Sequence, residues 1–200
     1  RDLFHTAAYG DPSERFFIAA RAEGSLIEDV DGNRFIDFGS GWGTNNFGNC
    51  NPEVVEAVSA ALRRAGVMCW TSAGNSVQRL ELAEKLLAVC PKRTDRVVFL
   101  TTGTEAVEAA LRIMRRASER PIVLSFYGQY HGLSYGALAA GPLQSDMRDD
   151  VMPLVNGVVH APYPYAYRTP LRSREGGPGR AALEFIDEFI LRYEIPPKRI

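Results

Sequence analysis

The sequence predicts an α/β fold in which helices cover a mixed sheet, and two patterns carry that prediction. The apolar run "RVVFL", which ends at Leu100, precedes a helix pattern and then a second apolar run, "IVLSF", after Pro121. Continuous apolar runs are typical of strands buried on both faces, and parallel strands need a long connection, usually a helix. Upstream, "GSLIEDVDGNRFIDF" alternates apolar and polar residues around Asp31-Gly32, which indicates an antiparallel hairpin.

Composition limits the class of protein. The 200 residues are 46% hydrophobic and 24% charged, which is ordinary for a chain with a sizeable core. A net charge of -1 gives no electrostatic basis for binding nucleic acid or an anionic membrane, and no apolar run is long enough to span a membrane. Cys50, Cys69 and Cys90 are odd in number and widely spaced, which favours a reducing compartment. We therefore expect a cytoplasmic protein.

The helices follow from capping signals and periodicity. Asn51-Pro52 is a typical N-cap followed by a first helical residue, and it opens an amphipathic helix that ends at Gly66. A second helix is predicted from about Asn75 to Val89. A third, from Thr104 to about Ala117, is expected to bury one apolar face and to leave three arginines in water; the apolar residues are Ala106, Ala109, Ala110 and Ile113, and the arginines are Arg112, Arg115 and Arg116.

The corner "TTGT" lies between the predicted strand Val97–Leu100 and the third helix. A helix N-terminus has unpaired N–H groups and a partial positive charge, which favour an anion such as phosphate. The same residues also suit an ordinary N-cap, with Thr102 or Thr104 capping the helix and Glu105 complementing its dipole. Ligands of open α/β sheets bind at the carboxyl edge, where this corner is expected. Both interpretations stay open on this evidence.

The second apolar run leads into "SFYGQYHGLSYGALAAG", in which aromatic residues alternate with small ones. A flat aromatic side chain near a phosphate site suggests stacking on a planar heterocycle, although packing under a glycine-rich loop explains the pattern equally well. His131 is either an acid–base group or a hydrogen-bonded structural residue. His5, His131 and His160 lack metal-ligand spacing, so no metal is assigned.

Three stretches together resemble the class III pyridoxal-phosphate aminotransferases, the family of the 4-aminobutyrate, acetylornithine and ω-amino acid transaminases. They are "EGSLIEDVDGNRFIDFGSGWGTNNFGNCNPEVVEAV", "FLTTGTEAVEAALRIMRRA" and "SFYGQYHGLSYGAL", in the family's order and spacing. The resemblance covers nearly the whole chain from Gly24 onward. It implies a fold-type I pyridoxal-phosphate transferase, with residues 1–49 in the small domain and 50–200 forming the first part of the large cofactor-binding domain.

The resemblance also implies roles for particular residues. The turn that includes Thr102, Gly103 and Thr104 is expected to hold the phosphate of pyridoxal 5'-phosphate with backbone N–H groups and a hydroxyl. Tyr130, just before His131 in the "HG" motif, is expected to stack on the pyridine ring, so both are assigned to the cofactor site. The further implications are a substrate-pocket wall at Trp42, amine and 2-oxo acid substrates, and a homodimer.

Two departures from the family pattern concern the substrate. Relatives acting on 4-aminobutyrate or acetylornithine commonly have arginine after "HG", where it binds a substrate carboxylate, whereas this chain has Leu133. The family's "GHCHP"-like stretch is "GNCNP" here, with Asn49 and Asn51 in place of both histidines. Because Asn51 still caps its helix, we expect that second change to be structurally mild.

None of the three lysines suits the Schiff base that pyridoxal-phosphate enzymes form with a lysine. Lys85 lies in a predicted helix, Lys92 in a turn and Lys198 after two prolines. We therefore interpret the chain as the N-terminal half of a transaminase whose Schiff-base lysine lies downstream. A racemase or decarboxylase that uses the same cofactor, and a non-catalytic relative, are the alternatives.

Overall fold

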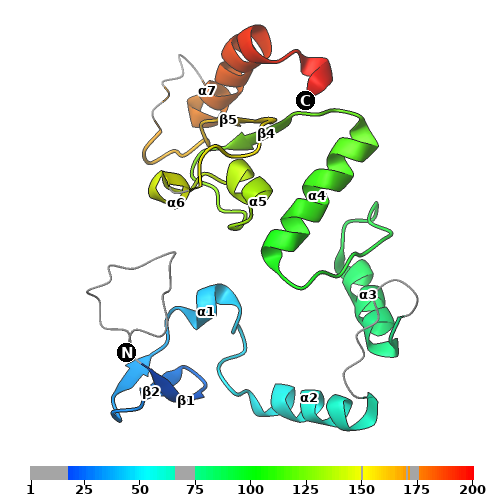
Figure 1. Cartoon of the computed structure of the whole chain (residues 1–200), viewed down its shortest axis with the longest axis vertical. Coiled ribbons are helices and arrows are strands. Elements are labelled where there is room, and N and C mark those ends of the chain that lie inside the picture. Colours follow the sequence, from blue (N-terminus) through cyan, green and yellow to red (C-terminus); the bar gives the residue numbers. More distant parts are fainter. Residues whose placement is uncertain (1–17, 66–74, 150, 170, 172–175) are drawn as a thin grey trace. The chain divides into compact units, whose positions relative to one another are not determined.

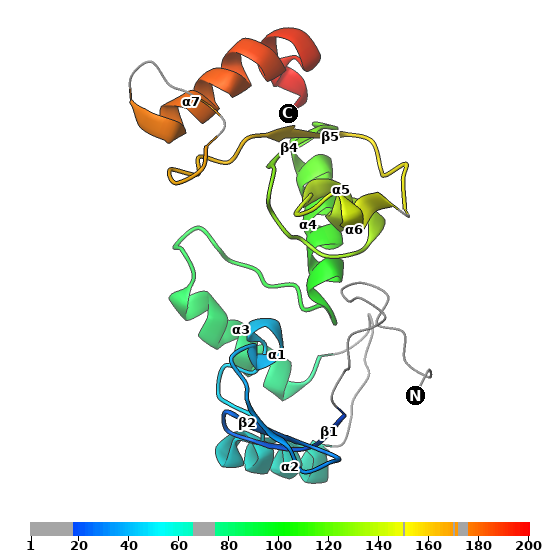
Figure 2. The same ribbon diagram turned by 90° about the vertical axis from the view of Figure 1, so that its left-hand side faces the viewer.

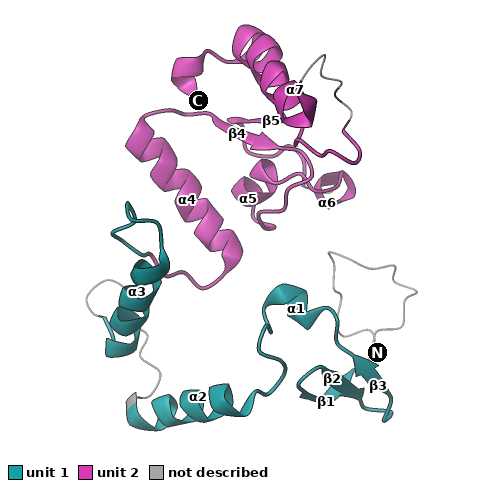
Figure 3. Cartoon of the chain, turned by 180° about the vertical axis from the view of Figure 1, so that it is seen from behind, with its two compact units in different colours: residues 1–97 teal, residues 98–200 magenta. Residues whose placement is uncertain are grey.

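The computed structural model describes residues 18–65, 75–149, 151–169, 171 and 176–200. His5, Gly66 and Cys69 therefore lie outside the described residues. The chain divides into two compact units, residues 1–97 and 98–200, and each is described by itself (Figure 3). Among the described residues, no helix is both long enough and apolar enough to cross a membrane.

Unit 1 begins with a small antiparallel sheet in the order β1-β2-β3, formed by Ala19–Glu23, Leu26–Asp29 and Arg34–Ile36. The turn between the last two strands is organised by Asp29, whose carboxylate accepts hydrogen bonds from the backbone N–H of Asp31 at 3.0 Å and of Asn33 at 2.8 Å. Gly32 has a φ of +83°, which residues with side chains rarely adopt. The hairpin predicted around Asp31-Gly32 is confirmed.

The helices of unit 1 start where their caps predict. α2 (Pro52–Ala65) follows Asn51, whose side-chain oxygen accepts from the N–H of Glu53 at 3.0 Å and of Val54 at 3.3 Å. α3 (Val77–Val89) is capped by Ser76, one residue after the expected start. The short helical segment α1 (Ser40–Gly43) differs, because Ser40, Gly41, Trp42 and Gly43 all have positive φ, so it is a left-handed turn and not an ordinary helix.

Unit 2 is built on two parallel strands, β4 (Val123–Phe126) and β5 (Val158–Ala161), paired from Val123↔Val158 to Phe126↔Ala161. α7 (Gly177–Phe185) and the π-helical segment η1 (Ile186–Glu194) lie on one side of these strands. α4 (Gly103–Ser118), α5 (Tyr135–Ala140) and α6 (Asp146–Asp149) lie on the other, as Figures 1 and 2 show. A short 3₁₀ turn, η2 (Pro197–Arg199), follows η1. The core consists mainly of small residues, and its fully buried members include Ala137, Ala161 and Ile190.

Two sequence predictions about this region are wrong. Val97–Leu100 is not a strand, and β4 pairs with β5 instead of with this segment. An apolar run becomes a strand only where a neighbour completes its hydrogen-bond ladder, and the described residues provide none for it.

The buried face of α4 also differs from the predicted one. Ala106, Ala110 and Ile113 are exposed. The side of α4 that packs on the rest of unit 2 carries Thr104, Glu108, Leu111 and Arg115. Arg115 was expected in water, yet it is half-buried and its Nη2 donates to the carbonyl of Gly157 at 3.3 Å. The spacing of apolar residues predicted the wrong buried face of α4, because hydrogen bonds from α4 to the loop after β4 and to α5 determine which face is covered.

Candidate functional site

The start of α4 is a capping box. The Thr102 hydroxyl accepts from the N–H of Glu105 at 3.2 Å, and the Glu105 carboxylate accepts from the N–H of Thr102 at 2.9 Å and of Thr101 at 3.1 Å. The N-cap interpretation of Thr102 is therefore correct. Capping leaves two donors at this helix start without a partner, because the N–H groups of Gly103 and Thr104 have no acceptor among the described residues. These two donors, at the positive end of a helix of 16 residues, can hold an anion.

The loop after β4 lies directly on this helix start. Gly132, with a φ of +126°, approaches Thr104 so closely that a Cβ there would stand 2.6 Å from the Cβ of Thr104. The N–H of Ser134 donates to Thr104 Oγ1 at 3.1 Å, and the two hydroxyl oxygens are 2.7 Å apart. The Thr104 hydroxyl is thus bound to the loop and the free donors are backbone groups.

Glu108, one helical turn after Thr104, joins α4 to α5. Its Oε1 accepts from the Ser134 hydroxyl, from the N–H of Gly136 at 2.8 Å and from the N–H of Ala137 at 3.1 Å. The hydrogen bond from Ser134 lowers the pKa of Glu108 below its ordinary value, against the opposing effect of burial. The carboxylate therefore stays ionised at neutral pH and caps the first turn of α5.

The loop carries the predicted cofactor and substrate residues of unit 2. Tyr130 is 50% exposed and Leu133 is 45% exposed, so both side chains are accessible to a ligand. His131 is half-buried, and its Nε2 lies 3.0 Å from Oε1 of Gln129. A carbonyl oxygen can only accept, so the histidine donates this hydrogen bond and helps to hold the loop.

Trp42 belongs to unit 1, where it lies on the left-handed turn α1 with a φ of +58° and a side chain that is 91% exposed. Positive φ is strained for a bulky residue, and such strain is commonly kept where function needs it. Asn49 anchors this segment, because its Nδ2 donates to the Asp37 carboxylate at 3.1 Å and its backbone pairs with Gly24. That hydrogen bond also contributes to lowering the pKa of Asp37, after the larger effect of the Ser40 N–H.

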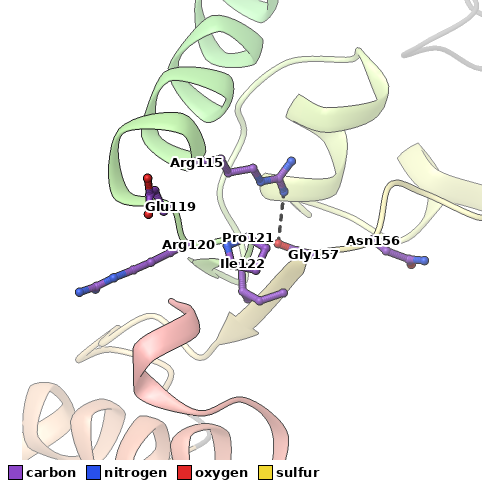
Figure 4. Close-up of a pocket in the computed structure, with 7 residues that line it drawn as sticks. All are labelled: Arg115, Glu119, Arg120, Pro121, Ile122, Asn156 and Gly157. Atoms are coloured by element: carbon purple, nitrogen blue, oxygen red, sulfur yellow. Dashed lines mark hydrogen bonds between the residues drawn. The ribbon is translucent and has the colours of Figure 1, made fainter.

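Other features of unit 2 lie at the opposite end of β4. Lys198 is exposed on η2, and the carbonyl of the next residue, Arg199, accepts from the N–H of Ile122 at the start of β4. A hollow of about 610 Å³ lies where α4 ends and β4 begins, and Figure 4 shows Arg115 turned across it toward Gly157. The loop with Tyr130 follows the other, carboxyl end of β4, so neither feature belongs to the site at the start of α4.

Sequence reasoning missed Glu108 and Ser134. Glu108 is four residues after Thr104, so the two share a helix face. An acidic residue between Val107 and Ala109 also indicates a specific hydrogen-bond partner for its carboxylate. Ser134 stands just before α5, a usual capping position. Neither signal identifies the residue on the other side of the contact, because these hydrogen bonds join segments about 30 residues apart.

A loop that closes on a helix start at the carboxyl edge of parallel strands is typical of α/β enzymes that bind phosphorylated ligands. Residues 8–189 match the sequence profile described as aminotransferase class-III, so the chain belongs to the class-III aminotransferase family. The cofactor of this family is pyridoxal phosphate.

Individual relatives agree with the assignment. The alanine/serine racemase of Pyrococcus horikoshii is 30% identical over 193 residues, which are 92% of this chain and 39% of that protein. A probable 4-aminobutyrate aminotransferase of Bacillus subtilis is 30% identical over 185 residues, 90% of this chain and 41% of its own length. The solved taurine:2-oxoglutarate aminotransferase of Bifidobacterium kashiwanohense, in complex with pyridoxal phosphate and glutamate, aligns with a TM-score of 0.83 at 25% identity, over 99% of this chain and 44% of that one. The chain thus spans about 40% of the length of these curated relatives.

Proposed function

We propose that the complete protein is a pyridoxal-phosphate-dependent transaminase, and that the start of α4 is its phosphate site. The supporting observation is the pair of unpartnered N–H groups of Gly103 and Thr104, set beneath the loop that carries Tyr130. A phosphate dianion needs several donors and is stabilised by the helix dipole. Backbone donors fit this need, because they are fixed by the helix itself.

The residues of this site divide the tasks of holding the cofactor. The N–H groups of Gly103 and Thr104 hold the phosphate, and Thr102, whose hydroxyl oxygen accepts from Glu105, still has its own proton to donate. Tyr130 stacks on the ring, and His131 supports the loop through Gln129. Pyridoxal phosphate supplies the electron sink that lets an amino group be exchanged. The lysine that attaches it belongs to the part of the protein beyond these 200 residues.

The substrate side follows from Leu133 and Trp42. Leucine offers apolar surface at a position where a guanidinium would pair with a carboxylate through two hydrogen bonds. We propose a substrate contact for the exposed indole of Trp42 in unit 1 as well. Both residues favour amine donors with an apolar or aromatic tail, and a 2-oxo acid takes the amino group. We further propose a cytoplasmic homodimer, with residues 1–49 in the small domain and residues 50–200 in the large one.

Racemisation is the second candidate, favoured by the similarity to the alanine/serine racemase of P. horikoshii over 92% of this chain. The same site can hold the cofactor for either reaction. The two reactions differ in their products: a racemase returns its amino acid with the other configuration, whereas a transaminase converts the donor to a carbonyl compound.

A half-reaction separates the two. The complete protein, loaded with pyridoxal phosphate, is mixed with an amine donor in the absence of any 2-oxo acid. A transaminase converts one equivalent of donor to its carbonyl product and leaves pyridoxamine phosphate, seen by absorbance and chromatography. If the cofactor stays pyridoxal phosphate while a chiral amino acid loses its optical purity, the protein is a racemase.

A further inference from the structure

A partly buried hydrogen-bond relay connects the start of α4 to the loop after β4, and its centre is Glu108. Its carboxylate accepts from three donors, the Ser134 hydroxyl and the N–H groups of Gly136 and Ala137. A Cβ on Gly136 would collide with this carboxylate, so the glycine permits the approach. Glu108 is thus fixed from three sides, and it belongs to the same helix as the proposed phosphate donors.

The direction of each hydrogen bond follows from the chemistry of the groups. An ionised carboxylate only accepts, so the Ser134 hydroxyl donates its proton to Glu108. Ser134 Oγ must then accept the proton of the Thr104 hydroxyl, 2.7 Å away. In return, Thr104 Oγ1 accepts from the N–H of Ser134 at 3.1 Å. The relay therefore runs one way, from Thr104 through Ser134 to Glu108.

This relay sets the position of two parts of the site. It holds the loop segment from Gly132 to Ser134 against the first turn of α4, in the place where Gly132 touches Thr104. It also turns the Thr104 hydroxyl proton toward the loop. Of the donors of Gly103 and Thr104, only the two backbone N–H groups are then left for contact with an anion.

We propose that Glu108 is a positioning residue for the phosphate site, acting through Ser134 and Thr104 without touching the cofactor. The proposal rests on the proposed function, since it assumes that the cofactor phosphate binds at the start of α4. Replacing the carboxylate by an amide keeps an oxygen that can accept but removes its charge, which weakens the three hydrogen bonds to this side chain and loosens the hold on Ser134 and Thr104.

The test measures the dissociation constants of two probes on the complete apoprotein, pyridoxal phosphate and pyridoxal, which lacks the phosphate. The variants are Glu108→Gln, Ser134→Ala and the double variant. Glu84→Gln is the matched control, because Glu84 is an exposed glutamate in the middle of α3. We expect Glu108→Gln to weaken pyridoxal phosphate binding roughly tenfold, with a clearly smaller change for pyridoxal. The two substitutions should not be additive, since they interrupt one relay.

Two results would overturn the proposal. One is unchanged affinity of Glu108→Gln for pyridoxal phosphate. The other is an equal loss for both probes together with a lower melting temperature, which would make Glu108 a structural residue only. If Glu108→Gln does not fold, Ser134→Ala decides by the same criterion. A wild-type protein that binds neither probe would instead contradict the proposed function, so the two failures can be told apart.

Discussion

At the scale of single residues, the charge state of Glu108 gives the site a pH dependence. The Ser134 hydrogen bond, opposed by burial and assisted by the N–H groups of Ala137 and Gly136, lowers the pKa of Glu108 below 4.5. A carboxyl group with a lowered pKa in the folded state adds stability at pH values above its unfolded pKa. That stability is lost as the pH falls from about 4.5 through the lowered value.

We therefore expect Glu108→Gln to be less stable than wild type at neutral pH, and the difference to shrink as the pH falls below 4.5. Urea unfolding at neutral and acidic pH measures this difference, with Glu84→Gln as the control that changes the same functional group on an exposed surface. A difference between Glu108→Gln and wild type that stays constant across this range would contradict an ionised Glu108 in the native state.

In the proposed transaminase, Leu133 is the residue that we expect to influence substrate choice. Burying an unpaired carboxylate against leucine costs on the order of several kcal/mol, which excludes such a substrate unless another cation compensates. We expect low kcat/KM for 4-aminobutyrate and a higher value for a matched amine without the carboxylate. Leu133→Arg should reverse this order, because a guanidinium pairs with a carboxylate. The proposal would be wrong if the wild-type protein strongly preferred 4-aminobutyrate and Leu133→Arg did not increase kcat/KM for it. Leu133 would then not disfavour a substrate carboxylate.

At the scale of elements, the contact between the loop and α4 depends on a glycine. Gly132 and Gly128 both have positive φ, +126° and +79°, but only Gly132 faces a neighbour, because nothing lies within 4 Å of a Cβ on Gly128. We expect Gly128→Ala to lower the free energy of unfolding by about 1 kcal/mol, from backbone strain alone. Gly132→Ala should lower it by roughly 1–3 kcal/mol more, because the new methyl group clashes with Thr104. Denaturant unfolding of both variants measures the comparison. Equal losses of unfolding free energy in the two variants would contradict the close contact between Gly132 and Thr104.

Elements with local signals were predictable from the sequence. The Asp31-Gly32 turn, the Asn51 cap and the Thr102–Glu105 box each involve residues within five positions of one another, so the pattern contains the whole interaction. The pairing of β4 with β5 and the buried face of α4 were not predictable, because they depend on partners farther along the chain. For the same reason the sequence indicated a phosphate site at "TTGT" but not the role of Glu108 in it.

At the scale of the whole molecule, the described units leave many large apolar side chains uncovered. On α2 alone, Val54, Val55, Val58 and Leu62 are all 46–53% exposed. Apolar faces of this extent are usually covered by another part of the protein or by a partner. Since the curated relatives are more than twice as long, we propose further sequence of a longer protein and a second subunit as this cover.

We expect residues 1–200 expressed alone to aggregate or to bind a hydrophobic dye strongly, and to bind pyridoxal phosphate weakly compared with the complete protein. Size-exclusion chromatography, dye fluorescence and a cofactor titration measure these properties, and the complete protein serves as the control. A soluble monomer of residues 1–200 that unfolds cooperatively would show that the units need no further cover.

We propose above all that backbone N–H groups at the start of α4 hold the cofactor phosphate, and Gly103 allows a direct test. It is the first residue of α4, a position where proline is favoured. Apart from its chain neighbours and the backbone of its own helix, nothing lies within 4 Å of a Cβ built there. Thr102 has the extended backbone, φ −129° and ψ 159°, that a following proline requires. Gly103→Pro therefore removes one N–H donor and keeps the helix, while Gly103→Ala keeps the donor.

The deciding measurement is the affinity of the complete apoprotein for pyridoxal phosphate in these two variants, with pyridoxal as the probe that lacks the phosphate. We expect Gly103→Pro to lose roughly tenfold or more in affinity for pyridoxal phosphate, whereas Gly103→Ala stays close to wild type and pyridoxal binds all three proteins alike. Equal affinity of both variants for pyridoxal phosphate, whether unchanged or equally weakened, would contradict it.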